Sequence, residues 1–234
     1  MRTAVVTGAA RGIGRAIAER LAADFTHLVL VDVAPSLADT TLDLEADGID
    51  VVAVQVDLTT DGGILAVIDA LDGPIHALVN NAGITRDARL VNLGEEDFRV
   101  VLDVNLGVPL RLATAVEHWG DDATIVNIAS RAYLGNFGQF NYSMSKGGVV
   151  GLTRALALDL APAVRVNAVA PGLTATDMVE TIPDEVIARM IAAIPLERMG
   201  RPSEIADVVA WLCSPESSYV TGQVVVVGGG RSLS

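Results

Sequence analysis

A tyrosine and a lysine four residues apart, Tyr142 and Lys146, are the side chains of this sequence best suited to proton transfer. Lys146 is the only lysine among the 234 residues, and the other basic residues are all arginine. On a helix, positions i and i+4 lie on one face, one turn apart. A cation held there favours the phenolate, so it is expected to lower a tyrosine pKa that is about 10 when unperturbed. Such a tyrosine can transfer a proton near neutral pH, although an isolated Tyr-x-x-x-Lys sequence is more often a surface pair.

A glycine-rich turn near the start of the chain is typical of a phosphate-binding loop. The apolar run Thr3–Thr7 predicts a strand, Gly8, Gly12 and Gly14 follow it, and an apolar face then indicates a helix. Glycine lets the backbone approach a pyrophosphate closely, and the free amides of a helix N-terminus favour an anion. The spacing Gly-x-x-x-Gly-x-Gly is a variant of the dinucleotide-binding fingerprint. A tight strand-to-helix turn also needs glycine, so the loop does not by itself establish cofactor binding.

Asp32 stands at the end of the second predicted strand, His27–Val31. An acid in this position, beyond the glycine loop, can accept hydrogen bonds from an adenosine ribose and would repel a 2′-phosphate. The alternative is a turn aspartate. Arg11 could serve a 2′-phosphate, but no second basic residue follows Asp32. The sequence therefore favours NAD(H), with NADP(H) as the alternative cofactor.

Polar and small residues follow two further predicted strands. Ile75–Val79 runs into Asn80–Gly83, and the fifth strand ends just before Ser130. The carboxyl ends of parallel strands form the crevice where open α/β sheets bind ligands. A helix is predicted over 95–116, and Asn105 lies in its interior, where asparagine is locally unfavourable. Asn105 is therefore either a functional residue or a buried amide with satisfied hydrogen bonds.

Seven short β-rich runs alternate with helical patterns along the chain. This alternation predicts a doubly wound parallel sheet of the Rossmann type, flanked by helices, in a single α/β domain over residues 1–234. The helix that begins near Tyr142 is apolar nearly all round, so one side is expected to pack on the sheet and the other on a second subunit. Residues 176–194, interrupted by Pro183, form a candidate lid. The predicted strands are Thr3–Thr7, His27–Val31, Val51–Val56, Ile75–Val79, Ala123–Ile128, Val164–Val169 and Gln223–Val227.

The formal net charge of −13 argues against two classes of partner. A nucleic-acid surface needs a basic stripe, and an anionic membrane attracts basic segments. No apolar run approaches the roughly 18 residues that span a bilayer, and the single cysteine, Cys213, cannot form an internal disulfide. The histidines His27, His76 and His118 lie far apart, so no metal site is expected. These features indicate a cytoplasmic protein that acts on a small molecule.

Together these motifs resemble the short-chain dehydrogenase/reductase family, in its shorter single-domain branch. The resemblance covers nearly the whole chain, and the motifs occur in the family's order. Each motif alone is weak, but their joint occurrence argues strongly against a surface pair at Tyr142 and Lys146. The matching positions are the loop Thr7–Gly14, Asp57, Asn80–Gly83, Asn105, Ser130, Tyr142, Lys146, Pro171, Gly172 and Thr176.

The resemblance implies an oxidoreductase that interconverts a ketone and a secondary alcohol. In the family's pattern, Tyr142 is the general acid in reduction and the base in oxidation, and Lys146 lowers its pKa and binds the nicotinamide ribose. Ser130 would hydrogen-bond the substrate oxygen, which stabilises the alkoxide-like transition state. Asn105 would help to hold a water that links Lys146 to solvent. The nicotinamide carries out the hydride chemistry, and the protein supplies position and electrostatics.

The resemblance also implies where the cofactor lies and how the chains assemble. Asp57 would contact the adenine, Asn81 and Gly83 would line the cofactor, and Thr176 would hold the carboxamide. A homotetramer with closed symmetry is expected. The further expected cofactor contacts are Gly8, Arg11, Gly12, Ile13, Gly14, Asp32, Leu58, Ala82, Tyr142, Lys146, Pro171, Gly172 and Thr174.

Within the family, stretches such as Asn80–Asp87 look most like 3-oxoacyl-(acyl-carrier-protein) reductases and acetoacetyl-CoA reductases. Two features depart from that group. Asp32 points away from the NADPH preference common there, and Glu117–Asp122 would repel an acidic carrier protein. The sequence therefore leaves three functions open. A general ketone or alcohol oxidoreductase is favoured, a 3-oxoacyl thioester reductase is the second, and a dinucleotide-sensing protein that has lost catalysis is the third.

Overall fold

A seven-stranded parallel sheet forms the centre of the computed structural model, which describes residues 2–233 except 177–178 and 180–182. The strand order is β3-β2-β1-β4-β5-β6-β7. The connections change direction between β1 and β4, as in a doubly wound fold. The strands are β1 (Thr3–Thr7), β2 (His27–Asp32), β3 (Asp50–Gln55), β4 (Ile75–Asn80), β5 (Trp119–Ile128), β6 (Val164–Pro171) and β7 (Val224–Val227). The predicted fold class is confirmed.

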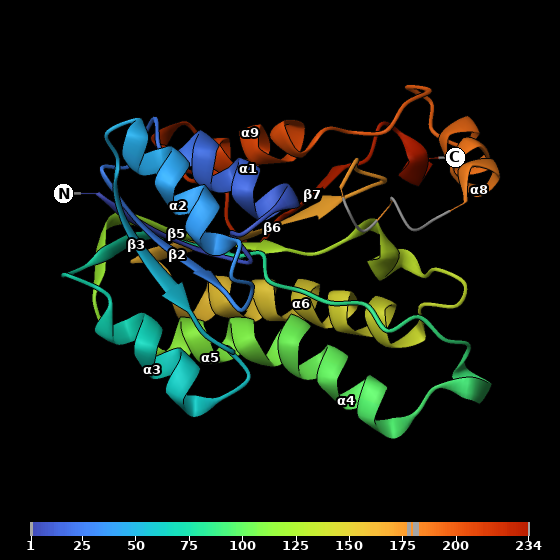
Figure 1. Cartoon of the computed structure of the whole chain (residues 1–234), viewed down its shortest axis with the longest axis horizontal. Coiled ribbons are helices and arrows are strands. Elements are labelled where there is room, and N and C mark those ends of the chain that lie inside the picture. The colour runs from blue at the N-terminus through green and yellow to red at the C-terminus, as the bar shows by residue number, and fades with distance from the viewer. Residues whose placement is uncertain (1, 177–178, 180–182, 234) are drawn as a thin grey trace.

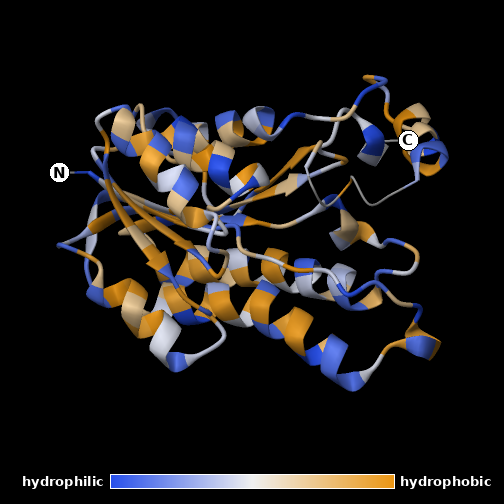
Figure 2. Cartoon of the chain, viewed as in Figure 1, coloured by the Kyte–Doolittle hydropathy of each residue, from blue (hydrophilic) through white to orange (hydrophobic). Residues whose placement is uncertain are grey.

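Alternate residues of each strand supply two apolar cores, one on each face of the sheet. Along β1, Ala4 and Val6 pack in one core, while Val5 between them packs in the other. Successive side chains of a strand point to opposite faces. Because helices cover both faces, a parallel strand is apolar throughout rather than alternating with polar residues. Figure 2 shows this directly, with the central strands coloured as hydrophobic along most of their length.

The helices form a layer on each side of the sheet (Figure 1). One layer holds α1 (Gly12–Leu21), α2 (Leu37–Ala46) and α9 (Pro202–Leu212). The other holds α3 (Asp61–Asp69), α4 (Glu95–Leu102), α5 (Val108–Ala115) and α6 (Phe140–Asp159). Short turns named η1 (Leu90–Asn92), η3 (Arg131–Leu134), η4 (Pro215–Ser217) and η5 (Arg231–Leu233) are 3₁₀ helices.

Two differences from the predicted helices have physical reasons in the fold. The sequence did not predict α2, whose interior Asp and Thr residues have low helix propensity, so the helix depends on burying Leu37 and Leu44. The predicted helix over 95–116 is interrupted by a π-helical turn, η2 (Asp103–Gly107), between α4 and α5. A π turn adds one residue to the helical repeat and is found frequently at functional sites.

The candidate lid over 176–194 lies partly outside the described residues. Its second part is α8 (Asp184–Ala192), which begins directly after Pro183. The expected helical break at Pro183 is therefore found, whereas the predicted helical character of 177–178 and 180–182 falls on residues that are not described.

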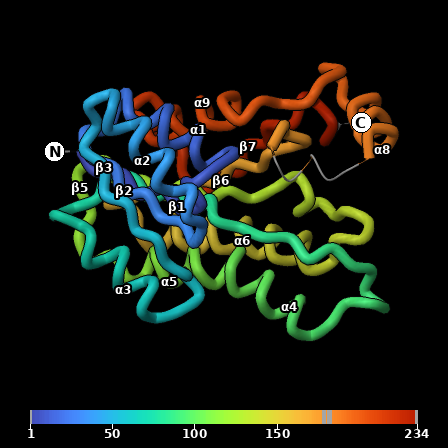
Figure 3. Tube along the Cα trace, in the orientation of Figure 1, coloured from blue at the N-terminus to red at the C-terminus, as the bar shows by residue number. Residues whose placement is uncertain are grey.

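The carboxyl ends of the strands lie at the end of the sheet away from the N-terminus (Figure 3). Residues expected to act in the site follow these ends, from Gly8 after β1 to Gly172 after β6. Among the residues described, no helix combines the length and the apolarity needed to cross a membrane.

Candidate active site

The three side chains expected to carry the reaction meet at the carboxyl end of β5. Lys146 is only 3% exposed, and its Nζ donates a hydrogen bond of 2.7 Å to the carbonyl oxygen of Ile128. The Nζ lies 5.8 Å from the ring centroid of Tyr142. The Tyr142 phenol lies close enough to the Ser130 hydroxyl for that hydroxyl to lower the tyrosine pKa. One turn of α6 and the last residues of β5 thus assemble the site from neighbouring backbone.

The electrostatics of this group differ from the expectation. Burial lowers the pKa of Lys146 to about 8. Burial raises the pKa of Tyr142, the hydrogen bond from Ser130 lowers it, and the charge of Asp87 raises it, so that the net direction is upward. The sequence predicted a lowered Tyr142 pKa with Lys146 as the cause. That prediction is wrong for this structure because desolvation of the phenolate outweighs the other effects.

Ser130 occupies the junction between β5 and the η3 turn. Its backbone is extended, with φ −167°, and its side-chain oxygen accepts a hydrogen bond of 3.1 Å from the amide of Ala132. A serine oxygen that caps a turn in this way loses rotational freedom. Its hydroxyl is therefore held towards Tyr142 by the local backbone, which favours a defined position for a substrate oxygen.

Asn105 lies inside the π turn and clamps the segment that follows β4. Its Oδ1 accepts from the amide of Ile84 at 2.8 Å, and its Nδ2 donates to the Ile84 carbonyl oxygen at 3.0 Å and to Ser145 Oγ at 3.0 Å. Asn105 is 1% exposed, so the buried, satisfied amide is the interpretation that the side chain supports. The same clamp brings Asn105 Oδ1 and Lys146 Nζ to Gly83, where an added Cβ would lie 3.2 and 3.3 Å from them.

Close packing explains the glycines of the loop after β1. A Cβ on Gly14 would collide with the carbonyl oxygen of Gly8, and a Cβ on Gly8 would lie 2.7 Å from Asn81 Nδ2. Gly12 has φ +56°, a conformation that L side chains rarely adopt. Helix α1 begins there, and its exposed N-cap residue, Arg11, makes no side-chain cap. The first amides of α1 are thus available to an anion.

Asp32 joins the second strand to this loop. Its Oδ2 accepts from the amide of Ala10 at 3.0 Å, and its Oδ1 accepts from the amide of Ala34 at 2.9 Å. The structure therefore places a carboxylate directly against the glycine loop. The turn-aspartate role and a role beside a cofactor are compatible, because a carboxylate has about four acceptor sites.

The segments after β3 and β4 complete the edge of the site. Asp57 Oδ1 accepts from the amide and the hydroxyl of Thr59 at 2.9 and 2.7 Å, and these bonds lower the pKa of the carboxyl. Asn81 Nδ2 donates to the carbonyl oxygens of Thr7 and Gly8 at 2.9 and 3.0 Å. The amide of Ala82 donates to Thr7 Oγ1 at 3.0 Å. The expected cofactor-lining residues on β1 and β4 are thus in direct contact.

The segment after β6 approaches the glycine loop from the other side. A Cβ on Gly12 would lie 3.5 Å from Thr176 Cγ2. The amide of Gly172 donates to the carbonyl oxygen of Val227 at 2.8 Å, which ties the end of β6 to β7. Thr174 is 5% exposed and donates to the Gly172 carbonyl oxygen at 3.3 Å. The remaining expected residues lie on the same edge, with Leu58 buried, Ile13 half-buried and Pro171 buried as the last residue of β6.

Two residues of the site were not predicted. Ser145 donates to the Tyr142 carbonyl oxygen at 2.8 Å and accepts from Asn105 Nδ2, so it joins α6 to the π turn. Its position three residues after Tyr142 was the available signal. Asp87 is held by Gln139 Nε2 at 2.8 Å and raises the pKa of Tyr142. No sequence pattern indicated Asp87, because its proximity to Tyr142 arises only from the fold.

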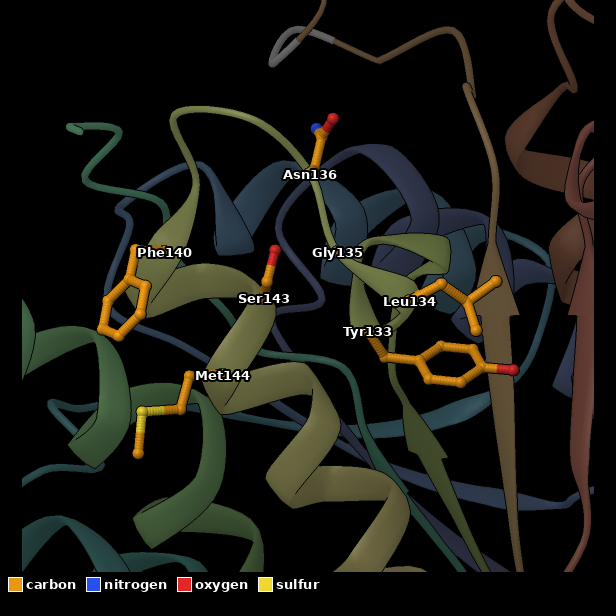
Figure 4. A pocket seen from close by; sticks show the side chains of 7 residues that line it. All are labelled: Tyr133, Leu134, Gly135, Asn136, Phe140, Ser143 and Met144. Atoms are coloured by element: carbon orange, nitrogen blue, oxygen red, sulfur yellow. The ribbon is translucent and has the colours of Figure 1, made fainter. Parts of the chain in front are cut away.

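A hollow of about 550 Å³ lies beside the site rather than within it. In Figure 4, Tyr133 and Leu134 point to one side of the loop, and Phe140 and Met144 point to the other. On α6, Phe140 and Met144 share a face that is turned away from Tyr142. The residues that line this hollow do not include Ser130, Tyr142 or Lys146. Among the described residues there is no group of three or more acidic, His or Cys side chains placed to hold a metal.

Comparison with known proteins places the whole chain in one family. The sequence family described as enoyl-(acyl carrier protein) reductase matches residues 8–232. The 3-oxoacyl-[acyl-carrier-protein] reductase FabG of Aquifex aeolicus is 40% identical over 243 residues, which cover 98% of this chain and 96% of that protein. The (2S)-[(R)-hydroxy(phenyl)methyl]succinyl-CoA dehydrogenase subunit BbsD of Thauera aromatica is also 40% identical, covering 99% and 97%.

A solved structure gives the same result. The putative NAD(P)-dependent gluconate 5-dehydrogenase of Beutenbergia cavernae, solved with bound NADP at low occupancy, has a TM-score of 0.92 and 35% sequence identity, and the match covers 100% of this chain and 97% of that one. Sequence and structure agree along nearly the full length. The chain therefore belongs to the short-chain dehydrogenase/reductase family.

Proposed function

We propose that the chain transfers a hydride between NAD(H) and a ketone or secondary alcohol, with Tyr142 as the general acid and base. Membership of the family makes it an NAD(P)-dependent oxidoreductase that acts on alcohol and carbonyl groups. The observation that carries the residue assignment is the contact of the Tyr142 and Ser130 side chains beside the buried ammonium group of Lys146.

The raised pKa of Tyr142 means that the phenol stays protonated at neutral pH. A phenol that stays protonated at neutral pH can donate its proton to the oxygen of a ketone as that oxygen becomes negative. The Ser130 hydroxyl donates a second hydrogen bond to the same oxygen and stabilises the developing charge. Lys146 supplies positive charge near the phenolate after the proton has left. In the oxidative direction the same groups act in reverse, and ionised Tyr142 accepts the proton of the alcohol.

The residues along the carboxyl edge fit a dinucleotide. The uncapped amides of α1 suit a pyrophosphate. Because Gly14 has no Cβ, the loop can pack closely against the start of this helix. Asp57 would hold the adenosine end, Asn81 and Gly83 the middle, and Thr176 the carboxamide. When bound, the nicotinamide gives or accepts the hydride.

NADH is proposed as the preferred form because of Asp32. Its carboxylate lies 3.0 Å from the amide of Ala10 in the glycine loop. Ribose hydroxyls can donate hydrogen bonds to a carboxylate there, whereas a 2′-phosphate would be repelled. Arg11, at the start of α1, is the one nearby cation in the loop sequence that could offset this repulsion.

The replacement Tyr142→Phe tests the function. It removes the proton donor but keeps the ring, so turnover of a ketone should fall about 100-fold or more, while NADH binding measured by fluorescence titration stays nearly intact. Tyr219→Phe is the matched control, because Tyr219 is fully exposed. Turnover retained in Tyr142→Phe would refute the assignment. NADH binding without turnover of any carbonyl by the unaltered protein would instead favour a sensing protein.

Reduction of a 3-oxoacyl thioester is the second candidate, favoured by the 40% identity to the FabG enzyme. Glu117, Asp121 and Asp122 are exposed before and within β5, which argues against an acidic carrier protein and less against a CoA thioester. The other relatives named above act, by their names, on a CoA derivative and on a sugar acid, so the family does not decide between substrates. Rates with acetoacetyl-CoA beside aliphatic, cyclic and aryl ketones would decide.

We further propose a cytoplasmic homotetramer. Two groups of apolar side chains remain exposed on helical faces and at the last strand. Leu110 and Leu158 on α5 and α6 are 44% and 82% exposed. Trp211 on α9 and Val226 on β7 are 41% and 38% exposed. Two separate apolar surfaces are what a tetramer of closed symmetry needs, since each serves a different two-fold contact.

A further inference from the structure

Arg131, the residue after Ser130, has an unpaired guanidinium group. Its Nε is buried and has no hydrogen-bond partner. Within the part of the chain that the structure describes, no hydrogen bond or ion pair of its side chain is found, and its two terminal nitrogens are not among the buried unpartnered atoms. These nitrogens therefore reach solvent beside the site. An unpaired arginine is unexpected in a chain with 29 acidic residues and a net charge of −13.

A second arginine, Arg231, adds its charge at the same edge. It begins η5, directly beyond β7, while Arg131 begins η3, directly beyond β5. Strand β6 lies between them, and the amide of Gly172 at its end bonds to Val227 of β7. Burial and the charge of Arg131 both lower the pKa of Arg231. Arg231 has a further interaction within the chain, whereas Arg131 contributes open hydrogen-bond donors.

A buried guanidinium nitrogen without a hydrogen-bond partner is unfavourable, and the positive charge of Arg231 nearby adds to this cost for Arg131. Arginine is the residue that best binds the oxygens of a carboxylate or phosphate, because its planar fork can donate two parallel hydrogen bonds. A protein of strongly negative net charge repels anions in general. A local pair of arginines is what such a protein needs in order to accept an anionic ligand.

We propose that Arg131, supported by the charge of Arg231, binds a carboxylate or phosphate group of the carbonyl substrate. This inference rests on the proposed function. Because Arg131 is the neighbour of Ser130, the anionic group would lie close to the reacting carbonyl or at the end of a chain that leads from it. The substrate class is thus an anionic ketone or its alcohol.

The opposite side of the site carries the opposite charge. Asp87 follows β4, whereas Arg231 follows β7, and β5 with Ser130 at its end lies between these strands. Asp87 acts on Tyr142 electrostatically. An anionic substrate is therefore repelled at the β4 side and attracted at the β7 side, which fixes its orientation between Ser130 and Tyr142.

Two matched pairs of substrates test the proposal. Acetoacetate and methyl acetoacetate differ in one carboxylate next to the ketone. Acetoacetyl-CoA and the acetoacetyl thioester of N-acetylcysteamine differ in the pantothenate and nucleotide portions of CoA, of which only the phosphates are anionic. For each pair, the ratio of kcat/KM for the anionic to the neutral member is measured in the unaltered protein, in Arg131→Gln and in Arg154→Gln. Arg154, an exposed arginine on α6, is the control for loss of one charge.

The ratio for one pair should fall about tenfold or more in Arg131→Gln, which is the effect of losing a charge-assisted hydrogen bond, and should remain within about twofold in Arg154→Gln. The pair that responds identifies the anion as a carboxylate or a phosphate. Arg131→Lys should restore part of the ratio. Because each ratio compares two substrates of one variant, a general loss of activity does not alter it.

A second readout does not require turnover. Inorganic phosphate is titrated by calorimetry against the unaltered protein and Arg131→Gln, and binding should be about tenfold weaker in the variant. Failure of all four carbonyl compounds to react would count against the proposed function, and the phosphate titration would then decide on the anion site. The anion site is refuted if neither ratio nor phosphate binding depends on Arg131. A fall in oligomer mass with unchanged ratios would show that Arg131 instead pairs with an acid of a second copy.

Discussion

Replacing Asp32 by serine or asparagine should erode the preference for NADH over NADPH. In the structure, this carboxylate accepts hydrogen bonds from the amides of Ala10 and Ala34 at 3.0 and 2.9 Å. It is therefore fixed against the glycine loop, and it cannot swing away from a 2′-phosphate without giving up both bonds. Serine removes the charge and the reach of the side chain, whereas asparagine keeps its size and one acceptor oxygen.

The magnitude follows from the charges. Two unit charges 4 Å apart repel by about 1 kcal/mol in water and by about 4 kcal/mol at an effective dielectric constant near 20. A phosphate monoester carries about −1.5 to −2 charges at pH 7. Loss of the Asp32 charge should thus favour NADPH by at least about 1.4 kcal/mol, or tenfold. The orphaned amides of Ala10 and Ala34 cost stability, and each unsatisfied donor that stays buried costs about 1–3 kcal/mol.

The assay is the ratio of kcat/KM for NADH to that for NADPH, measured with one carbonyl substrate at fixed ionic strength. Because both cofactors are compared in the same variant, lost stability affects the two values alike. The ratio should fall tenfold or more in both variants. The fall should be larger at low salt, where charges are less screened. An unchanged ratio in both folded variants would refute Asp32 as the selector. Preference for NADPH in the unaltered protein would show that Arg11 dominates.

Two further outcomes follow from the electrostatics and the surface. Asp87→Asn removes a charge that raises the pKa of Tyr142, so this pKa falls. In the proposed mechanism, reduction needs protonated Tyr142, so the reduction rate falls as the pH rises through the Tyr142 pKa. This fall should begin at a lower pH in the variant. The rate of alcohol oxidation should likewise begin to rise at a lower pH. Identical pH profiles at low salt would contradict the effect of Asp87. Light scattering of the unaltered protein should give about four times the chain mass of 24.3 kDa, and a monomer would refute the assembly inferred from Leu158 and Trp211.

The sequence predicted the sheet well because its strands carry the strongest local signal. A run such as Ile75–Val79 is apolar except for His76 and is followed by polar residues, a pattern typical of a buried parallel strand. The glycine loop was predictable for a related reason. Gly14 has no room for a Cβ beside Gly8, so the position requires glycine. A requirement for one residue type at one position can be seen in the sequence alone.

Features that depend on distant contacts were not predictable. Helix α2 has weak intrinsic propensity and is fixed by burial of Leu37 and Leu44. The π turn around Asn105 depends on the double hydrogen bond to Ile84, 21 residues earlier in the chain. Asp87 acts on Tyr142 across 55 positions. Periodicity reports local structure, and none of these three contacts is local.

The upward shift of the Tyr142 pKa shows why the spacing of Tyr142 and Lys146 alone gave the wrong direction. From spacing, Lys146 is a cation one turn from a phenol, and the phenol should ionise more easily. The fold, however, buries Lys146 and partly buries Tyr142, and this desolvation opposes the charge on each. The ammonium group keeps its position through the carbonyl oxygen of Ile128 at 2.7 Å, and its own pKa falls to about 8. When Tyr142 loses its proton, the charge of Lys146 becomes more favourable, because the phenolate is then its nearest opposite charge. In the proposed mechanism, Lys146 stabilises the phenolate that follows proton transfer, and burial favours the protonated form of Tyr142 before that step.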